Sequence, residues 1–253
     1  MRQRLAKRAQ LKLTPKSIDL RRQAKVVEAM LEDGDKVLDR NTLLKHLKRF
    51  GISGNTSLWA GMDHFSDFQN KSRMGPAQIP TELVDYLLYA GRLKPDTIAE
   101  IGIFNGGMSV FSAAFFQAIN KDMVYHCIDI EDHFQSRPLV KNILNLEFHI
   151  PASSDDLAGE VFDVVFIDGD HSYEWAKRDF ENLGKHARKL CAFHDIHGQE
   201  YIKQGGGVFQ FWRNLRSTIP LAATMLEISH AASTPSMPKA LWMGIGLIHF
   251  DRE

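Results

Sequence analysis

The chain has 253 residues, of which 44% are hydrophobic and 25% charged, and its 31 Lys and Arg balance 31 Asp and Glu. These proportions are ordinary for a globular protein and exclude a disordered or fibrous chain. The most apolar stretch, around residues 110–119, is too short to cross a bilayer, and no apolar signal-peptide segment follows the basic start. We therefore expect no membrane association, and a length of one α/β domain plus an accessory segment.

Charge is distributed unevenly along the chain. Residues 1–50 hold 14 Lys and Arg against 6 Asp and Glu. Such a basic arm can contact nucleic acid, or it can be the solvated face of helices that dock on the acidic remainder or on a second subunit. No aromatic residue precedes Phe50 to stack on bases, which favours the docking interpretation.

Residues 1–79 are predicted to form a helical cap segment. The pair Thr14-Pro15 suits a helix start, and apolar residues follow at helical spacing. A second helix is expected to begin after Asn41 and to end at Gly51. Residues 52–79 have weak periodicity and are interpreted either as a lid over a pocket or as a loop packed on the core. Their large side chains include Trp59, Met62, His64, Phe65 and Phe68.

Residues 80–253 show the pattern of one α/β domain. Pro80 opens a helix, and short β-like runs then alternate with helical segments. The runs are residues 97–102, 124–130, 146–150, 162–168 and 190–196. Two further strands, at 223–230 and 241–250, have no helix between them. The pattern predicts a seven-stranded sheet, parallel except for a terminal antiparallel hairpin, with helices on both faces.

Two cysteines lie in these apolar runs. We expect Cys127 and Cys191 to be buried thiols without a disulfide, which fits a reducing cytoplasm.

A glycine-rich turn follows the first of these strands, and ligands of parallel sheets bind at such carboxyl ends. It reads E-I-G-I-F-N-G-G over residues 100–107 and leads directly into a helix. Glycine lets the backbone approach a ligand, and a helix N-terminus presents free N–H groups to an anion. A dinucleotide fingerprint requires glycine where Phe104 stands, so a nicotinamide-dependent oxidoreductase is the weakest alternative. The spacing E-x-G-x-x-x-G instead resembles the donor motif of class I S-adenosylmethionine-dependent methyltransferases.

The next two strand ends extend this donor site. Asp129 ends the second strand, where an acidic residue can accept both ribose hydroxyls, although an aspartate there can also cap a helix. Ser153 follows the third strand, where the adenine edge would be read. The resemblance implies a Rossmann-like fold that binds S-adenosylmethionine. The implied donor residues are Glu100, Gly102, Ile103, Phe104, Asn105, Gly106, Ser109, Asp129, Ile130, Ser153 and Asp168.

Two further strand ends carry more polar residues than a turn requires. They read F-I-D-G-D-H-S-Y at 166–173 and A-F-H-D-I at 192–196. With G-V-F-Q-F-W at 207–212, these segments resemble the macrocin-type and cephalosporin-pathway O-methyltransferases over about residues 95–250. The resemblance implies a homo-oligomer that methylates a hydroxyl of a small molecule, such as a sugar or secondary metabolite.

Related metal-dependent enzymes hold a divalent cation, Mg²⁺ or Mn²⁺, at these two strand ends. Carried over by position, its ligands here are Asp168, His194 and Asp195. His194 stands where the family has an acidic residue, and imidazole suits Mn, Fe or Zn better than Mg, so metal binding and identity stay open. His171 lies where catechol-type members place a general base, and imidazole can accept a hydroxyl proton at neutral pH.

Three alternatives remain. A metal-independent enzyme would use His171 alone. A methyltransferase directed at RNA would use the basic arm, although base-amine enzymes carry N-P-P-Y or D-P-P-Y where this chain has D-G-D-H. A non-catalytic protein would bind the donor without turnover. We assign no role to His46, His126, His186 or His230. Acceptor specificity is expected in residues 52–79 and in the loop around 201–207.

Overall fold

The computed structural model describes residues 15–53, 71–72, 74–140, 142–198, 201–219, 223–234 and 237–250. The expectations about the basic arm before residue 15 therefore lie outside the described residues. So do those about Trp59, Met62, His64, Phe65 and Phe68.

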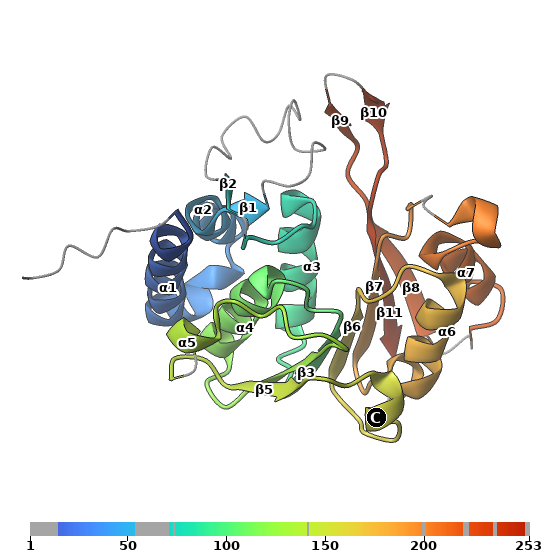
Figure 1. Ribbon diagram of the computed structural model, residues 1–253, viewed down its shortest axis with the longest axis horizontal. Helices are drawn as coiled ribbons and strands as arrows, with labels where there is room; N and C mark the ends of the chain where they lie inside the picture. The colour runs from blue at the N-terminus through green and yellow to red at the C-terminus, as the bar shows by residue number, and fades with distance from the viewer. Residues whose placement is uncertain are drawn as a thin grey trace, which may run out of the picture.

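A seven-stranded sheet of order β5-β4-β3-β6-β7-β11-β8 forms the centre of the molecule (Figure 1). Its parallel strands are β3 (Thr97–Ile101), β4 (Val124–Ile128), β5 (Leu146–His149), β6 (Val164–Ile167) and β7 (Leu190–His194). Strand β11 (Ile245–Phe250) runs antiparallel between β7 and β8 (Ala223–Ile228). The predicted sheet is confirmed. Because the strand order reverses beside β3, the carboxyl ends of β3 and β6 flank a crevice where ligands of such sheets bind.

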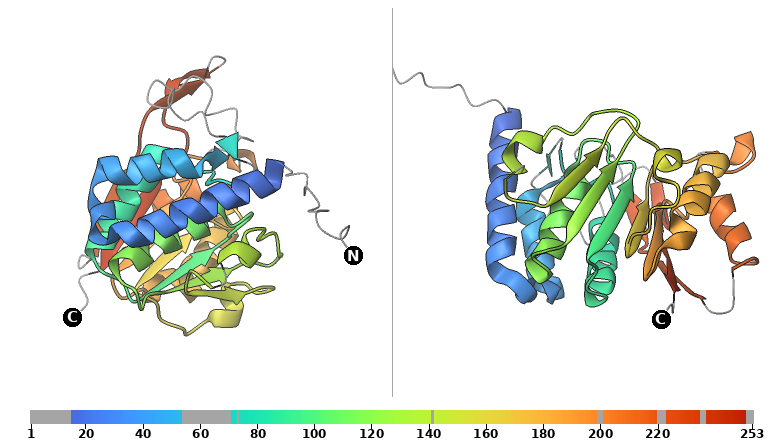
Figure 2. Two further views of the ribbon diagram at one scale, coloured as in Figure 1. Left: turned by 90° about the vertical axis from the view of Figure 1, so that its left-hand side faces the viewer. Right: turned by 90° about the horizontal axis from the view of Figure 1, so that it is seen from below.

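Helices cover both faces of the sheet (Figures 1 and 2). One side carries α1 (Pro15–Asp33), α2 (Arg40–Phe50), α3 (Pro80–Arg92), α4 (Gly107–Ile119) and the short α5 (Arg137–Val140). The other side carries α6 (Tyr173–Asn182) and α7 (Val208–Leu215). Each side has its own hydrophobic core, one built around Phe111 and Phe115 and the other around Phe193 and Trp212. Burying a side chain of this size contributes about 1.5–3 kcal/mol.

The two N-terminal helices belong to the first of these cores. Met30 of α1 and Leu47 and Phe50 of α2 are fully buried with Phe111 of α4, whose ring centroid lies 5.3 Å from that of Phe50. Helix α2 begins before Asn41 because Asp39 caps it, accepting the Thr42 N–H at 2.9 Å. The division of the chain at residue 79 stays a prediction.

Short elements complete the described chain. Strands β1 (Ile52–Ser53) and β2 (Lys71–Ser72) pair in parallel, and 3₁₀ turns occupy Gly34–Leu38, Ser154–Leu157, Gly184–His186 and Ile202–Gln204. Strands β9 (Ala232–Thr234) and β10 (Met237–Ala240) form a small hairpin that projects from the body between β8 and β11 (Figure 1).

Two further expectations bear on burial and hydropathy. Cys127 and Cys191 are buried free thiols, as predicted. None of the helices in the described ranges is long and apolar enough to cross a membrane.

Candidate active site

The turn after β3 needs glycine at two places. Gly102 has φ +85°, and a Cβ there would lie 2.3 Å from the backbone oxygen of Asp168. Gly106, with φ +81°, packs so closely against the ring of Phe134 that a Cβ would lie 2.3 Å from it. Only glycine fits a left-handed backbone in such tight contact. The turn therefore brings the ends of β3 and β6 against each other.

Two residues at strand ends hold a left-handed backbone without being glycine. Phe104, after β3, has φ +47°, and its side chain is 59% exposed. Asp195, directly after β7, has φ +59° and is buried. A left-handed backbone costs an L-residue about 1–2 kcal/mol. Such residues cluster at functional sites, where the surrounding structure imposes the conformation.

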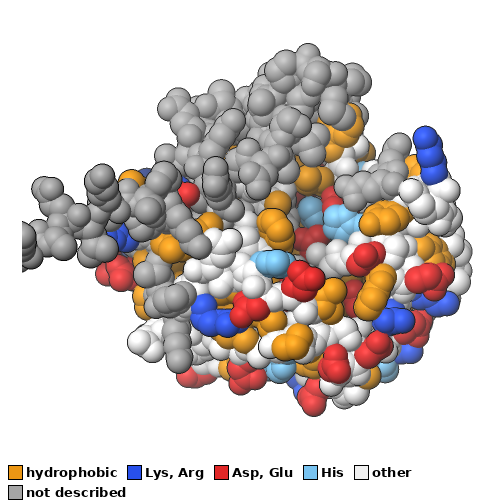
Figure 3. All heavy atoms as spheres, viewed as in Figure 1, with side chains coloured by type: hydrophobic (Ala, Val, Ile, Leu, Met, Phe, Trp, Pro, Cys, Tyr) orange, Lys and Arg blue, Asp and Glu red, His pale blue; other side chains and the backbone are white. Residues whose placement is uncertain are grey.

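Two neighbouring cavities open at this edge of the sheet. The larger, of about 400 Å³, includes Asp129, Ile130 and Ser153 in its wall, and the smaller, of about 360 Å³, includes Glu100, Ile103, Asn105, His171, His194 and Asp195. Both are lined by Gly102, Phe104, Asp168 and Gly169. Histidine and acidic side chains lie close together on the face shown in Figure 3. Two predicted donor residues, Gly106 and Ser109, line neither cavity, and Ser109 is fully buried within α4.

Carboxylates and imidazoles from two strand ends meet in the smaller cavity. His194 Nδ1 lies 3.0 Å from Asp168 Oδ1 and 3.4 Å from Asp195 Oδ2. His171 Nε2 lies 3.3 Å from that same Asp195 oxygen and 3.7 Å from Asp168 Oδ1. One ligand atom from each of Asp168, His194 and Asp195 falls within 4.8 Å of the others. The predicted metal ligands and the predicted base are therefore brought together.

Residues 99–196 match a family model described as a methyltransferase domain. The matched stretch contains the glycine turn, Asp129 and the cluster around Asp168. Over these residues the chain is similar to methyltransferase domains.

Solved structures agree with this fold. The O-methyltransferase from Bacillus cereus in complex with SAH is 15% identical, with a TM-score of 0.51 over 69% of this chain and 84% of that one. The O-methyltransferase TomG from Streptomyces achromogenes, involved in tomaymycin synthesis and solved with SAM, is 16% identical, with a TM-score of 0.53 over 83% of this chain and 96% of that one. At these identities the likeness shows the fold. Comparison with curated proteins gave no match.

Asp129 stabilises the glycine turn and also lines the larger cavity. Its Oδ2 accepts the N–H groups of Ile103 at 3.0 Å and Phe104 at 3.1 Å, and its Oδ1 accepts the N–H of Glu131 at 3.1 Å. Carboxylate oxygens can accept more than one hydrogen bond, so this bracing leaves capacity for a ribose hydroxyl. The ribose role stays a prediction.

Glu100 is an acid whose surroundings favour its protonated form. It is buried, the Tyr125 hydroxyl donates to its Oε2 at 2.8 Å, and burial raises its pKa to about 8. The electrostatics of the smaller cavity are therefore set by the cluster around Asp168. Burial alone would lower the pKa of His194, but the carboxylates of Asp168 and Asp195 outweigh it and raise that pKa well above its ordinary value.

Gln78 is a site residue that sequence reasoning missed. Its Nε2 donates to Asp168 Oδ2 at 2.6 Å, and it lines the smaller cavity. Within the described part of the chain, its buried Oε1 has no hydrogen-bond partner, and the same holds for His194 Nε2. Both side chains line the smaller cavity, so these atoms are available for hydrogen bonds to a ligand bound there. The only signal was the position of Gln78 at the end of the stretch interpreted as lid or loop.

Helix α6 supplies two more residues that were not predicted. Trp175 and Asp179, four positions apart and so on one helix face, line the larger cavity. Asp179 is buried, accepts the Ser154 hydroxyl at 2.6 Å, and has its pKa raised to about 6 by burial. The sequence pattern of α6 indicated the apolar face that packs on the core. The other face, which carries Trp175 and Asp179, was the signal that could have indicated these two residues.

Proposed function

We propose that this protein transfers the methyl group of S-adenosylmethionine to a hydroxyl oxygen of a small molecule. The observation that carries the proposal is the cluster of Asp168, His171, His194 and Asp195 in the smaller cavity, next to the wall shared with the larger one. In this proposal the donor occupies the larger cavity, with its ribose at Asp129. The acceptor hydroxyl enters the smaller cavity, so the reacting groups meet near Phe104 and Asp168.

The reaction is a single displacement. A lone pair of the acceptor oxygen attacks the donor methyl carbon, the carbon–sulfur bond breaks, and its electrons remain on sulfur to give S-adenosylhomocysteine. We propose His171 as the base that accepts the hydroxyl proton. The protein's main contribution is to hold the two reactants in line at attack distance.

The donor set at Asp168, His194 and Asp195 fits a divalent metal ion. Two carboxylate oxygens and one imidazole nitrogen gather within 4.8 Å, a combination that suits Mn²⁺ better than Mg²⁺. A cation bound there would lower the pKa of the acceptor hydroxyl. The second candidate is a metal-independent enzyme, favoured by the raised pKa of His194. Its imidazolium, donating to Asp168, would then supply the positive charge between the two carboxylates.

The loop at 201–207 is proposed to contribute to acceptor specificity. Tyr201 and Gly207 line a small hollow together with His171 and Asp195. The Val208 N–H donates to the backbone oxygen of His171 at 3.1 Å, which fixes the loop beside the proposed base. Assembly into a homo-oligomer stays a prediction, and an enzyme directed at RNA stays an alternative.

Calorimetry tests this proposal. S-adenosylhomocysteine is titrated into the protein, and Mn²⁺ into the saturated complex, for wild type, Asp168→Ala and Asp170→Ala. Asp170 is the control for the Mn²⁺ signal, because it lies on the same turn and in the wall of the larger cavity but outside the proposed ligand set, and it accepts the Ser172 N–H at 2.8 Å. We expect product binding in wild type, followed by Mn²⁺ binding that is one equivalent smaller in Asp168→Ala and unchanged in Asp170→Ala.

The other outcomes separate the candidates. Product binding without any Mn²⁺ signal, together with chelator-resistant methylation of a hydroxyl acceptor, would favour His171 acting alone. Product binding without turnover on any hydroxyl acceptor would favour a donor-binding protein without catalysis. Failure to bind the product would refute the proposed donor site.

A further inference from the structure

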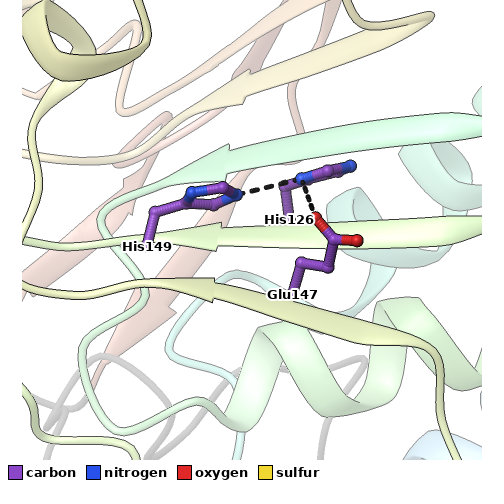
Figure 4. A group of neighbouring side chains, drawn as sticks. All are labelled: His126, Glu147 and His149. Carbon is purple, nitrogen blue, oxygen red and sulfur yellow. Dashed lines mark hydrogen bonds and ion pairs between the residues drawn. The ribbon is translucent and has the colours of Figure 1, made fainter.

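A second group of metal-ligand side chains lies at the edge of the sheet, on β4 and β5. His126 comes from β4, and Glu147 and His149 come from the edge strand β5 (Figure 4). His126 pairs in register with Glu147, and His149 is two residues further along β5. Side chains at positions i and i+2 of a strand share one face, and register partners do so too, which explains why three distant residues converge.

The distances between the ligand atoms suit a single cation. His126 Nδ1 lies 3.0 Å from His149 Nε2 and 3.3 Å from Glu147 Oε2, and one ligand atom of each residue falls within 4.8 Å of the others. Ligands bound at about 2.0–2.2 Å in a tetrahedral zinc site stand about 3.3 Å apart. The three side chains are therefore close to the spacing that a common metal ion requires.

The neighbouring side chains hold His126 in place, and the exposed side of the group leaves room for a fourth metal ligand. The His126 ring packs against Phe162 at 4.8 Å between centroids, and its side chain is 14% exposed. The His149 ring is nearly parallel to it, at 17° and 5.3 Å. Glu147, by contrast, is 59% exposed, so water can reach the remaining coordination position. Such an arrangement, with protein ligands on one side and an open position on the other, is compatible with zinc.

We propose that His126, Glu147 and His149 form a second metal site of this protein, for Zn²⁺ or a similar transition metal. Two imidazoles and one carboxylate select such metals over Mg²⁺ and Ca²⁺, which prefer oxygen ligands. Without metal, one of the two facing nitrogens, His126 Nδ1 or His149 Nε2, carries the proton of their hydrogen bond. Metal binding requires both facing nitrogens to be unprotonated, so that proton moves to the other nitrogen of its own neutral ring.

The site goes beyond the proposed methyl transfer, and its consequence is structural. Among the described strands of the main sheet, β5 pairs with β4 alone, so a cation bound to both strands adds a second attachment of the edge strand to the sheet. Both strands lead into the wall of the larger cavity, β4 through Asp129 and β5 through Ser153. Metal bound at the edge therefore stabilises the side of the proposed donor site that is farthest from the cluster around Asp168.

The test uses Co²⁺ as a coloured probe and Zn²⁺ as its competitor. The full chain carrying Asp168→Ala is titrated, so that the proposed acceptor-side metal site cannot contribute. We expect one equivalent of Co²⁺ with a visible absorption band that Zn²⁺ abolishes. Adding His126→Ala or His149→Ala should weaken binding by at least about tenfold, since even the loss of a residue that only orients a metal ligand costs 10–100-fold. Adding His186→Ala, at an exposed histidine of another turn, should change nothing.

Other results would overturn the inference. A Co²⁺ titration unchanged by His149→Ala would do so, as would the absence of Co²⁺ and Zn²⁺ binding by the Asp168→Ala protein. If Asp168→Ala does not fold, as judged by circular dichroism, the histidine variants are made in the otherwise wild-type chain. There, His149→Ala must remove one equivalent of Zn²⁺ and leave binding of S-adenosylhomocysteine measurable. If the wild-type protein does not bind S-adenosylhomocysteine, the proposed donor site is refuted, but the proposal of the metal site is unaffected.

Discussion

Replacing Gly102 with alanine tests whether the contact between β3 and β6 builds the donor site. The left-handed backbone, with φ +85°, costs an alanine about 1–2 kcal/mol. The new Cβ would also lie 2.3 Å from the Asp168 backbone oxygen, and overpacking of this kind costs about 1–3 kcal/mol more. We therefore expect Gly102→Ala to lower the free energy of unfolding by about 2–5 kcal/mol. Because Asp168 must move, S-adenosylhomocysteine should bind at least about tenfold more weakly, a change of about 1.4 kcal/mol.

Gly159 provides the matched control for this variant. It has φ +98°, but a Cβ there would meet nothing within 4 Å, so Gly159→Ala carries only the backbone cost of about 1–2 kcal/mol. Urea unfolding and calorimetric titration of the product are measured on both variants and on wild type. Equal unfolding midpoints and equal product affinities for the two variants would refute the reasoning, since the close approach to Asp168 would then have no energetic consequence.

Three further predictions follow from other contacts. Burial raises the pKa of Glu100 to about 8, against 4.5 in the unfolded chain. The folded protein therefore keeps a proton on Glu100 that the unfolded chain loses, and the wild-type free energy of unfolding should fall from pH 5 to 8 by up to the order of 4 kcal/mol. Urea titrations should show this slope flattened in Glu100→Gln, and an unchanged slope would contradict the assignment. Phe104→Gly removes an exposed ring between the cavities and its backbone strain, so calorimetry should show weaker product binding without loss of stability. Trp212 donates to Glu227 at 2.8 Å and covers Gly246, so thermal unfolding of Trp212→Phe should show a loss of about 1–3 kcal/mol, and an unaltered melting temperature would count against that contact.

The fold was predictable because its signals are local. The central strands β6 and β7 are short, largely apolar runs, and glycine marks the turn after β3 where the backbone must be left-handed. The cluster around Asp168 was also predictable from the sequence. The carboxyl ends of neighbouring parallel strands lie side by side whatever the exact register of the strands. The β9–β10 hairpin went unpredicted, because its strands have only three and four residues and belong to no larger periodic pattern.

The parts that could not be predicted depend on contacts between distant residues. Gln78 reaches Asp168 across 90 positions of the chain, and no local pattern indicates this. His126 received no role because its partners, Glu147 and His149, become neighbours only once the register of β4 and β5 is fixed. A shift of one residue would turn the β5 side chains to the opposite face. Asp129 shows a further limit, since sequence indicated its place but not that it braces its own glycine turn.

The position of β11 has a consequence for how the chain folds. Among the described strands, β7 and β8 are not neighbours, and β11, which follows both of them in the chain, pairs with each of them. During synthesis, β7 therefore keeps an unpaired edge until residues 245–250 emerge, and unpaired edges promote aggregation. Sheet closure must then proceed by insertion of a late strand between two earlier ones, a non-local step of the kind that slows folding. Truncation within β11 should accordingly leave both β7 and β8 open to wrong partners.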